Sequence, residues 1–198
     1  MTRIISGAAG SLPLATPAHG TRPTSDRVRE ALFSSLEAEG LLSGAHVADL
    51  YAGSGALGLE ALSRGAHSAV LVESSRSAAQ ICRRNAAAVA DAIAGPRATV
   101  AAIPVRRWLG QSSGTFDLVF LDPPYALAET ELAADLRALP RLLSSEASVV
   151  VERSSRSPEP ELPESLTLRR SKRYGETVLW ILERTGAAEP RRTAGSED

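Results

Sequence analysis

The stretch Val47-Ala-Asp-Leu-Tyr-Ala-Gly53-Ser-Gly55-Ala-Leu-Gly58 joins an apolar run to a helix-forming run through three glycines. Its pattern predicts a buried strand over Val47–Tyr51, a tight loop, and a helix over Ala56–Arg64 that ends at Gly65. Glycines in a G-x-G-x-x-G loop allow a sharp turn and let backbone amides approach a ligand at the helix N-terminus. The stretch therefore predicts the first strand–loop–helix unit of an open α/β sheet.

The sequence that follows repeats this alternation of strand and helix. Further strands are expected at Ala69–Glu73, Ala98–Ala102, Phe116–Leu121 and Ala147–Val151. Further helices are expected at Ser77–Ile93, Val105–Leu109 and Glu129–Leu142. Apolar strands that alternate with helices indicate a doubly wound, parallel sheet with helices on both faces. In the order 3-2-1-4-5, the first and fourth strands are neighbours at the point where ligands bind such sheets.

The two ends of the chain depart from this alternation. Ser165–Arg170 and Thr177–Leu182, joined by a turn at Tyr174-Gly175, predict a terminal antiparallel hairpin. Residues 1–20 contain two short β-like pieces and predict an N-terminal arm or hairpin outside the core. A helix capped by Ser25 or Asp26 follows the arm. We expect residues 21–185 to form the main domain and residues 186–198 to form a disordered tail.

The composition limits which classes of function the chain can have. With 198 residues, 43% of them hydrophobic, the chain can form one α/β domain with a full core. The single cysteine, Cys82, excludes an internal disulfide, and no metal site is expected. A net charge of −1 argues against a domain that holds nucleic acid by bulk charge alone. We expect a cytoplasmic monomer, because the sequence shows no secretory signal, no membrane-spanning run and no exposed apolar strip.

Two carboxylates beside the glycine loop point to the type of cofactor. Glu73 ends the second strand, twenty residues after Gly53, where it can accept hydrogen bonds from ribose hydroxyls. The loop alone fits a nicotinamide dinucleotide and S-adenosylmethionine equally. Asp49 favours S-adenosylmethionine, because a carboxylate repels a pyrophosphate but attracts an ammonium and a sulfonium. Alternatively, Asp49 caps loop amides and Glu73 is a solvated strand end. The expected cofactor-binding residues in this region are Asp49, Ala52, Gly53, Ser54, Gly55, Gly58 and Glu73.

The fourth strand ends in a second motif, Asp122-Pro123-Pro124-Tyr125. The amine of an aromatic base is a poor nucleophile, because its lone pair is delocalised into the ring. The Asp122 carboxylate and the Pro123 carbonyl can accept its two N–H groups and direct the lone pair at a methyl carbon. Tyr125 can stack on a base removed from its helix or loop. The catalytic candidates are therefore Asp122, Pro123 and Tyr125; the alternative is an Asx-Pro turn with a core-edge aromatic.

Together these motifs resemble those of amino-methyltransferases of the Asp-Pro-Pro-Tyr type, which modify adenine N6 or guanine N2. Arg3-Ile-Ile-Ser-Gly7 and Thr21-Arg-Pro-Thr-Ser-Asp-Arg-Val-Arg-Glu-Ala-Leu-Phe33 extend the resemblance to bacterial 16S ribosomal RNA guanine-N2 methyltransferases, over residues 1–183. The resemblance implies a Rossmann-like class I methyltransferase fold with a seven-stranded sheet, and methylation of a guanine of 16S rRNA in the assembled small subunit. It also implies Arg22 and Thr24 as cofactor or substrate contacts; the alternative there is a plain amphipathic helix with a polar cap.

The sequence departs from that family at two places. Ala8-Ala9-Gly10-Ser11 stands where the family's N-terminal hairpin usually carries basic and aromatic residues, which weakens RNA contacts from the arm. Ala101-Ala102-Ile103 stands where related enzymes often place a polar residue on the adenine amine, so no side chain is assigned there.

Three other functions are weighed against this one. A DNA adenine-N6 methyltransferase usually carries a separate target-recognition segment, for which the chain has no room. A nicotinamide-dependent reductase needs a proton donor such as Tyr-x-x-x-Lys, and the only lysine, Lys172, has no such partner. A non-catalytic RNA-binding assembly factor on the same fold would not need both motifs intact.

Overall fold

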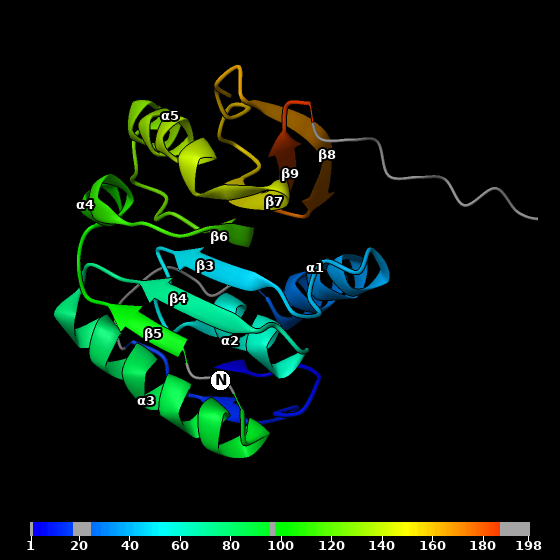
Figure 1. Cartoon of the computed structure of the whole chain (residues 1–198), viewed down its shortest axis with the longest axis vertical. Helices are drawn as coiled ribbons and strands as arrows, with labels where there is room; N and C mark the ends of the chain where they lie inside the picture. The colour runs from blue at the N-terminus through cyan, green and yellow to red at the C-terminus, as the bar shows by residue number, and fades with distance from the viewer. Residues whose placement is uncertain (1, 18–24, 96–97, 187–198) are drawn as a thin grey trace, which may run out of the picture.

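The computed structural model describes residues 2–17, 25–95 and 98–186 as a sheet with helices on both faces (Figure 1). The main sheet has seven strands in the order β5-β4-β3-β6-β7-β9-β8. Their bounds are β3 His46–Leu50, β4 Ser68–Val72, β5 Ala98–Ala101, β6 Phe116–Leu121, β7 Leu143–Ser154, β8 Leu166–Tyr174 and β9 Thr177–Arg184. Strands β3 to β7 are parallel, and β9 and β8 are antiparallel. The predicted α/β class, the 3-2-1-4-5 order and the terminal hairpin are confirmed.

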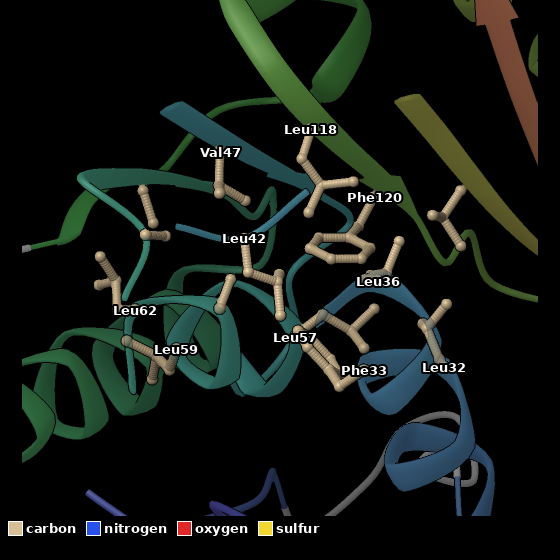
Figure 2. Packing of buried hydrophobic residues seen from close by; sticks show 14 of the residues in the cluster. Leu32, Phe33, Leu36, Leu42, Val47, Leu57, Leu59, Leu62, Leu118 and Phe120 are labelled. Atoms are coloured by element: carbon tan, nitrogen blue, oxygen red, sulfur yellow. The ribbon is translucent and has the colours of Figure 1, made fainter. Parts of the chain in front are cut away.

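Alternating side chains of the central strands divide the core into two layers. On β6, Leu118 and Phe120 face one layer while Val119 and Leu121 face the other, and all four are buried. The first layer holds α1 Asp26–Ala38, α2 Ala56–Ser63 and α3 Arg76–Ile93, and the second holds α4 Val105–Gln111 and α5 Glu129–Ala138. Figure 2 shows Phe33 of α1 beside Phe120, with ring centroids 5.6 Å apart.

The helices begin and end for local reasons. Ser25, one of the two predicted caps, accepts the Val28 amide with its hydroxyl, which fixes the start of α1. The helix predicted over Glu129–Leu142 is too long, because α5 ends at Ala138 and a 3-10 turn, Pro140–Leu142, follows. The following strand, β7, is in turn longer than the predicted Ala147–Val151. Among the described residues, no helix has the length and apolarity to cross a bilayer.

The N-terminal arm is part of the core, so the expectation that it lies outside was wrong. Its strands β1 Thr2–Arg3 and β2 Pro13–Leu14 form the predicted hairpin. Ile4, Ala9 and Leu14 are at most 4% exposed and pack in the layer that contains α1 to α3. Their irregular spacing hides this burial from a search for helix or strand periodicity.

Hydrogen bonds to α2 hold the arm in place. The buried carboxylate of Glu60 accepts the amides of Ile5 and Ser6 at 2.6 and 3.0 Å. The carbonyl of Ser63 accepts the Ala8 amide at 2.8 Å. Gly7 fits this contact because a Cβ there would lie 2.0 Å from the Ser63 oxygen, and because its φ is +82°. These hydrogen bonds thus attach the arm to α2, the helix that follows the glycine loop.

Candidate active site

The loops that follow β3, β4, β5 and β6 are tied together at the carboxyl edge of the sheet. Three backbone hydrogen bonds connect them. The amides of Glu73, Ala52 and Asp122 donate to the carbonyls of Ala101, Val72 and Leu50, at 3.0, 2.9 and 3.4 Å respectively. The structure therefore brings the glycine loop, Glu73 and the Asp122 motif to one edge, at the switch point where β3 and β6 are neighbours.

The three glycines of the loop meet two kinds of requirement, a positive φ angle and close packing. Gly53 and Gly55 have φ values of +56° and +82°, a region that residues with a Cβ rarely adopt. A Cβ on Gly53 would meet no atom within 4 Å, so a ligand can approach this backbone. A Cβ on Gly58 would lie 2.3 Å from Leu71 Cδ2, so Gly58 allows α2 to pack closely on β4. The other loop positions, Ala52 and Ser54, are half-buried beside them.

Asp49 is buried beneath the loop. Asp49 is only 1% exposed, and its Oδ2 accepts a hydrogen bond from the Gly58 amide at 2.9 Å. Burial raises the pKa of Asp49 to about 7, although the hydrogen bond from the Gly58 amide acts in the opposite direction and lowers it. The loop-capping alternative is thus seen in the structure. Each carboxylate oxygen has two lone pairs, so this bond does not exhaust the capacity of Asp49 to accept others.

Glu73 lies at the other side of the glycine loop and is half-buried. Its Oε2 accepts the Gly53 amide at 2.9 Å, and its Oε1 accepts the Ser75 amide at 2.7 Å. Ser75 is itself the N-cap of α3. The carboxylate is therefore fixed between the glycine loop and the start of α3, where its remaining lone pairs can accept ribose hydroxyls.

Tyr51 was not singled out by the sequence analysis. It has a φ of +66°, unusual for a residue with a side chain, directly before the glycine loop. Its hydroxyl donates to Oδ2 of Asp135 on α5, and Asp135 is 3% exposed. Burial, followed by the bond to Asp135, raises the pKa of Tyr51 well above its usual range. This bond attaches the strained start of the loop to α5.

The Asp122 motif begins directly after β6. Asp122 is half-buried and Pro123 is buried, whereas Tyr125 is 60% exposed. Tyr125 is the sole large hydrophobic side chain exposed to this degree among the described residues. An aromatic ring left in solvent beside a half-buried carboxylate suits a site for a planar, apolar-faced ligand.

Arg153 holds the residues that follow this motif, and the sequence analysis did not identify it either. It lies on β7 and is 4% exposed. Its Nη2 donates to the Leu127 carbonyl at 3.3 Å and to the carboxylate of Glu129, the first residue of α5. The only sequence signal was the charged pair Glu152-Arg153 directly after the apolar run Val149–Val151, a place where burial is expected. Arg153 thus fixes where the chain leaves the motif.

Two predicted contacts, Arg22 and Thr24, lie outside the described residues. The adjoining start of α1 is fixed by Arg29, which is 1% exposed. Its Nη2 donates to the Arg3 carbonyl at 2.6 Å and to Asp26 at 2.8 Å. Burial lowers the pKa of Arg29, and the neighbouring Asp26 opposes this shift. Arg29 therefore holds the arm and the start of α1 together.

This geometry can be compared with known proteins. A model of the family described as conserved hypothetical protein 95 matches residues 2–183. The chain belongs to this family. It is 36% identical over 188 residues to the ribosomal RNA small subunit methyltransferase D of Escherichia coli, covering 94% of this chain and 92% of the relative. The corresponding protein of Haemophilus influenzae is 33% identical over 177 residues, with 87% and 89% covered.

Solved structures show the same fold. The Escherichia coli protein YhhF is 33% identical, with a TM-score of 0.79 over 92% of this chain and 97% of that one. Magnesium protoporphyrin IX methyltransferase of Synechocystis, solved with bound S-adenosylmethionine, is only 17% identical but has a TM-score of 0.63 over 80% and 79% of the two chains. The predicted class I methyltransferase fold is confirmed, and S-adenosylmethionine is the methyl donor of that class.

Proposed function

We propose that this chain transfers a methyl group from S-adenosylmethionine to the exocyclic N2 amine of a guanine in 16S ribosomal RNA, within the assembled small subunit. One observation carries the proposal: the Asp122 motif, with its exposed Tyr125, follows a strand that pairs with the strand leading into the glycine loop, so both lie at one edge of the sheet. The relatives named as small-subunit rRNA methyltransferases, which match nearly the whole chain, support the RNA substrate. We expect the protein to act as a cytoplasmic monomer.

The residues at the edge fit S-adenosylmethionine. The open backbone of Gly53 admits a ligand, and no positively charged side chain of the loop competes with a cationic donor. Glu73 would accept the ribose hydroxyls, while the charge of Asp49 beneath the loop favours the ammonium and the sulfonium. Ala52, Ser54, Gly55 and Gly58 would shape the loop, and the family resemblance implies Arg22 and Thr24 as further cofactor or substrate contacts. When bound, the cofactor supplies an electrophilic methyl group.

The chain's own groups would prepare the amine. The Asp122 carboxylate and the Pro123 carbonyl accept its two N–H groups and pull the nitrogen toward tetrahedral geometry. Pro123 and Pro124 have fixed φ angles and donate no hydrogen bond, so the acceptors keep their direction. Tyr125 stacks on the guanine once the base has left its neighbours. Asp122 also stabilises the positive charge that develops on nitrogen during transfer.

The experiment supplies isotopically labelled methyl donor with small ribosomal subunits from cells that lack this activity, with bare 16S rRNA, or with duplex DNA. We expect label only on RNA, recovered as N2-methylguanosine after nuclease digestion, and faster on subunits than on bare RNA. Label on adenine N6 of the duplex would instead establish a DNA methyltransferase. Stoichiometric subunit binding without any transfer would instead establish an assembly factor.

A further inference from the structure

A depression of about 500 Å3 lies next to the Asp122 motif and has no role in the methyl transfer described above. It is lined by Tyr125, Ser154, Arg156, Ser157 and Glu176. Tyr125 therefore forms a wall shared with the site proposed for the target base. The other lining residues come from the end of β7, the loop after it, and the turn between β8 and β9. Whatever occupies this depression must lie directly beside that base.

The topology sets how far the depression extends from the reaction. Strands β7 and β9 are the first and second neighbours of β6 in the sheet. Since neighbouring strands are about 4.8 Å apart, β9 lies roughly 10 Å from β6 across the sheet. Leu121, the last residue of β6, is level with Val151 and Trp180, and β9 begins three residues beyond that level, at Thr177. A polynucleotide whose target base is stacked on Tyr125 continues away from that base along its sugar-phosphate backbone. The next backbone groups of the strand thus fall within reach of this surface.

The side chains around the depression suit phosphate. Arg156 is 86% exposed, and its Nη2 lies 3.5 Å from Glu176 Oε1, a long ion pair that exchanges readily. Arg173 is exposed beside it, held by bonds from Nε to the Gly175 carbonyl at 3.0 Å and from Nη2 to Ser155 Oγ at 3.2 Å. Two exposed arginines, of which Arg156 pairs with Glu176, therefore lie on this surface, in a chain whose total charge is −1.

The backbone of this surface is already ordered. The Ser155 amide donates to the Glu176 carbonyl at 2.8 Å, which joins the loop after β7 to the hairpin turn. The Arg156 amide donates to Ser154 Oγ at 3.2 Å. Since these bonds order the backbone that carries Arg156 and Arg173, binding costs the entropy of their side chains but little backbone entropy.

We propose that this depression, with Arg156 and Arg173 at its edge, binds the phosphate backbone of the RNA strand that flanks the target guanine. The proposal rests on the proposed function and adds a substrate-binding surface to it. Glu176 is placed to weaken this binding, because its carboxylate both pairs with Arg156 and repels phosphate. The surface contributes affinity for RNA and takes no part in the chemical step.

The test measures binding of the full-length protein to small ribosomal subunits purified from cells that lack this methyltransferase activity, at several salt concentrations, alongside steady-state methyl transfer. The double variant Arg156→Ala/Arg173→Ala should raise Kd and KM about tenfold and leave kcat within about twofold. The plot of log affinity against log salt has a negative slope, and its magnitude should decrease by about 1.4 to 2, because each lost phosphate contact contributes about 0.7 to 1. Glu176→Gln should tighten binding about threefold, a gain that mere destabilisation cannot produce.

The matched control is Arg84→Ala. Arg84 is an exposed arginine on α3, which packs on β5 at the opposite edge of the sheet (Figure 1). It should leave both Kd and the salt slope unchanged. The proposal is overturned if the double variant keeps the wild-type salt slope, if Arg84→Ala weakens binding equally, or if Glu176→Gln weakens it.

Two results separate this proposal from the proposed function. Arginine-dependent binding by a wild-type protein that methylates no RNA would support the surface and refute the enzyme function. Methylation of guanine N2, together with an unaltered salt slope in the double variant, would support the enzyme function and refute the proposed RNA-binding surface.

Discussion

Replacing Glu60 should detach the N-terminal arm, at a cost that follows from its contacts. Glu60 is fully buried and accepts the amides of Ile5 and Ser6 and the Nε of Arg64, the last at 2.8 Å. Glu60→Ala leaves two amides without an acceptor and leaves Arg64, 4% exposed, without its buried partner. We expect a loss of about 4 kcal/mol in the free energy of unfolding, a large share of a typical total. Glu60→Gln keeps one carbonyl acceptor and should lose about 2 kcal/mol.

Glu37→Gln is the matched control, because Glu37 pairs with the same Arg64 at 3.0 Å but is 60% exposed. An exposed ion pair contributes about 1 kcal/mol or less. Urea unfolding followed by circular dichroism gives the three free energies, and hydrogen exchange at the Ile5 and Ser6 amides shows whether the arm itself is released. Equal losses for Glu60→Gln and Glu37→Gln, or unchanged protection of the two amides in Glu60→Ala, would refute the reasoning.

Three further predictions concern the site. Asp122→Ala should lose about 3–4 kcal/mol of transition-state stabilisation in single-turnover methyl transfer, and Asp122→Asn about 1–2 kcal/mol; equal rates for the two would mean that charge, rather than orientation, matters. Because burial raises the pKa of Asp49 to about 7, ionising it destabilises the fold as pH rises from about 4 to 7, by up to about 4 kcal/mol. Urea titrations of Asp49→Asn should lack this slope, and a slope equal to wild type would contradict the assignment. Arg153→Ala should lower kcat about tenfold with little change in KM, with partial rescue by Arg153→Lys; a change in KM alone would exclude a positioning role.

The sequence predicted most of the sheet because its strands are short apolar runs separated by turn residues. The order of the parallel strands followed from their alternation with helices, and the glycine loop and Asp122 meet because both follow neighbouring strands. Helix ends were less predictable. The proline at position 140 ends α5, although the apolar pattern continues through Leu142.

The arm and the buried arginines could not be predicted in the same way. Ile4 and Leu14 are buried by packing against helices that lie far along the chain, and nothing in their own spacing records it. Arg153 is tied to Leu127 and Tyr51 to Asp135, pairs separated by 26 and 84 positions. Such contacts depend on tertiary packing, which local propensity and periodicity do not contain.

Helix α5 makes two side-chain contacts that hold the carboxyl edge of the sheet. Asp135, near the end of the helix, accepts a hydrogen bond from Tyr51, and Glu129, at its start, accepts one from Arg153. Leu132 and Leu136 between them are buried against the sheet. This helix of 10 residues, which rises about 1.5 Å per residue, therefore sets the separation between the glycine loop and the Asp122 motif. These two parts of the proposed site are thus held in place before any substrate binds. For the proposed reaction we therefore expect the slow rearrangement to be the unstacking of the guanine, so weakening that stack should accelerate turnover more than loosening the glycine loop.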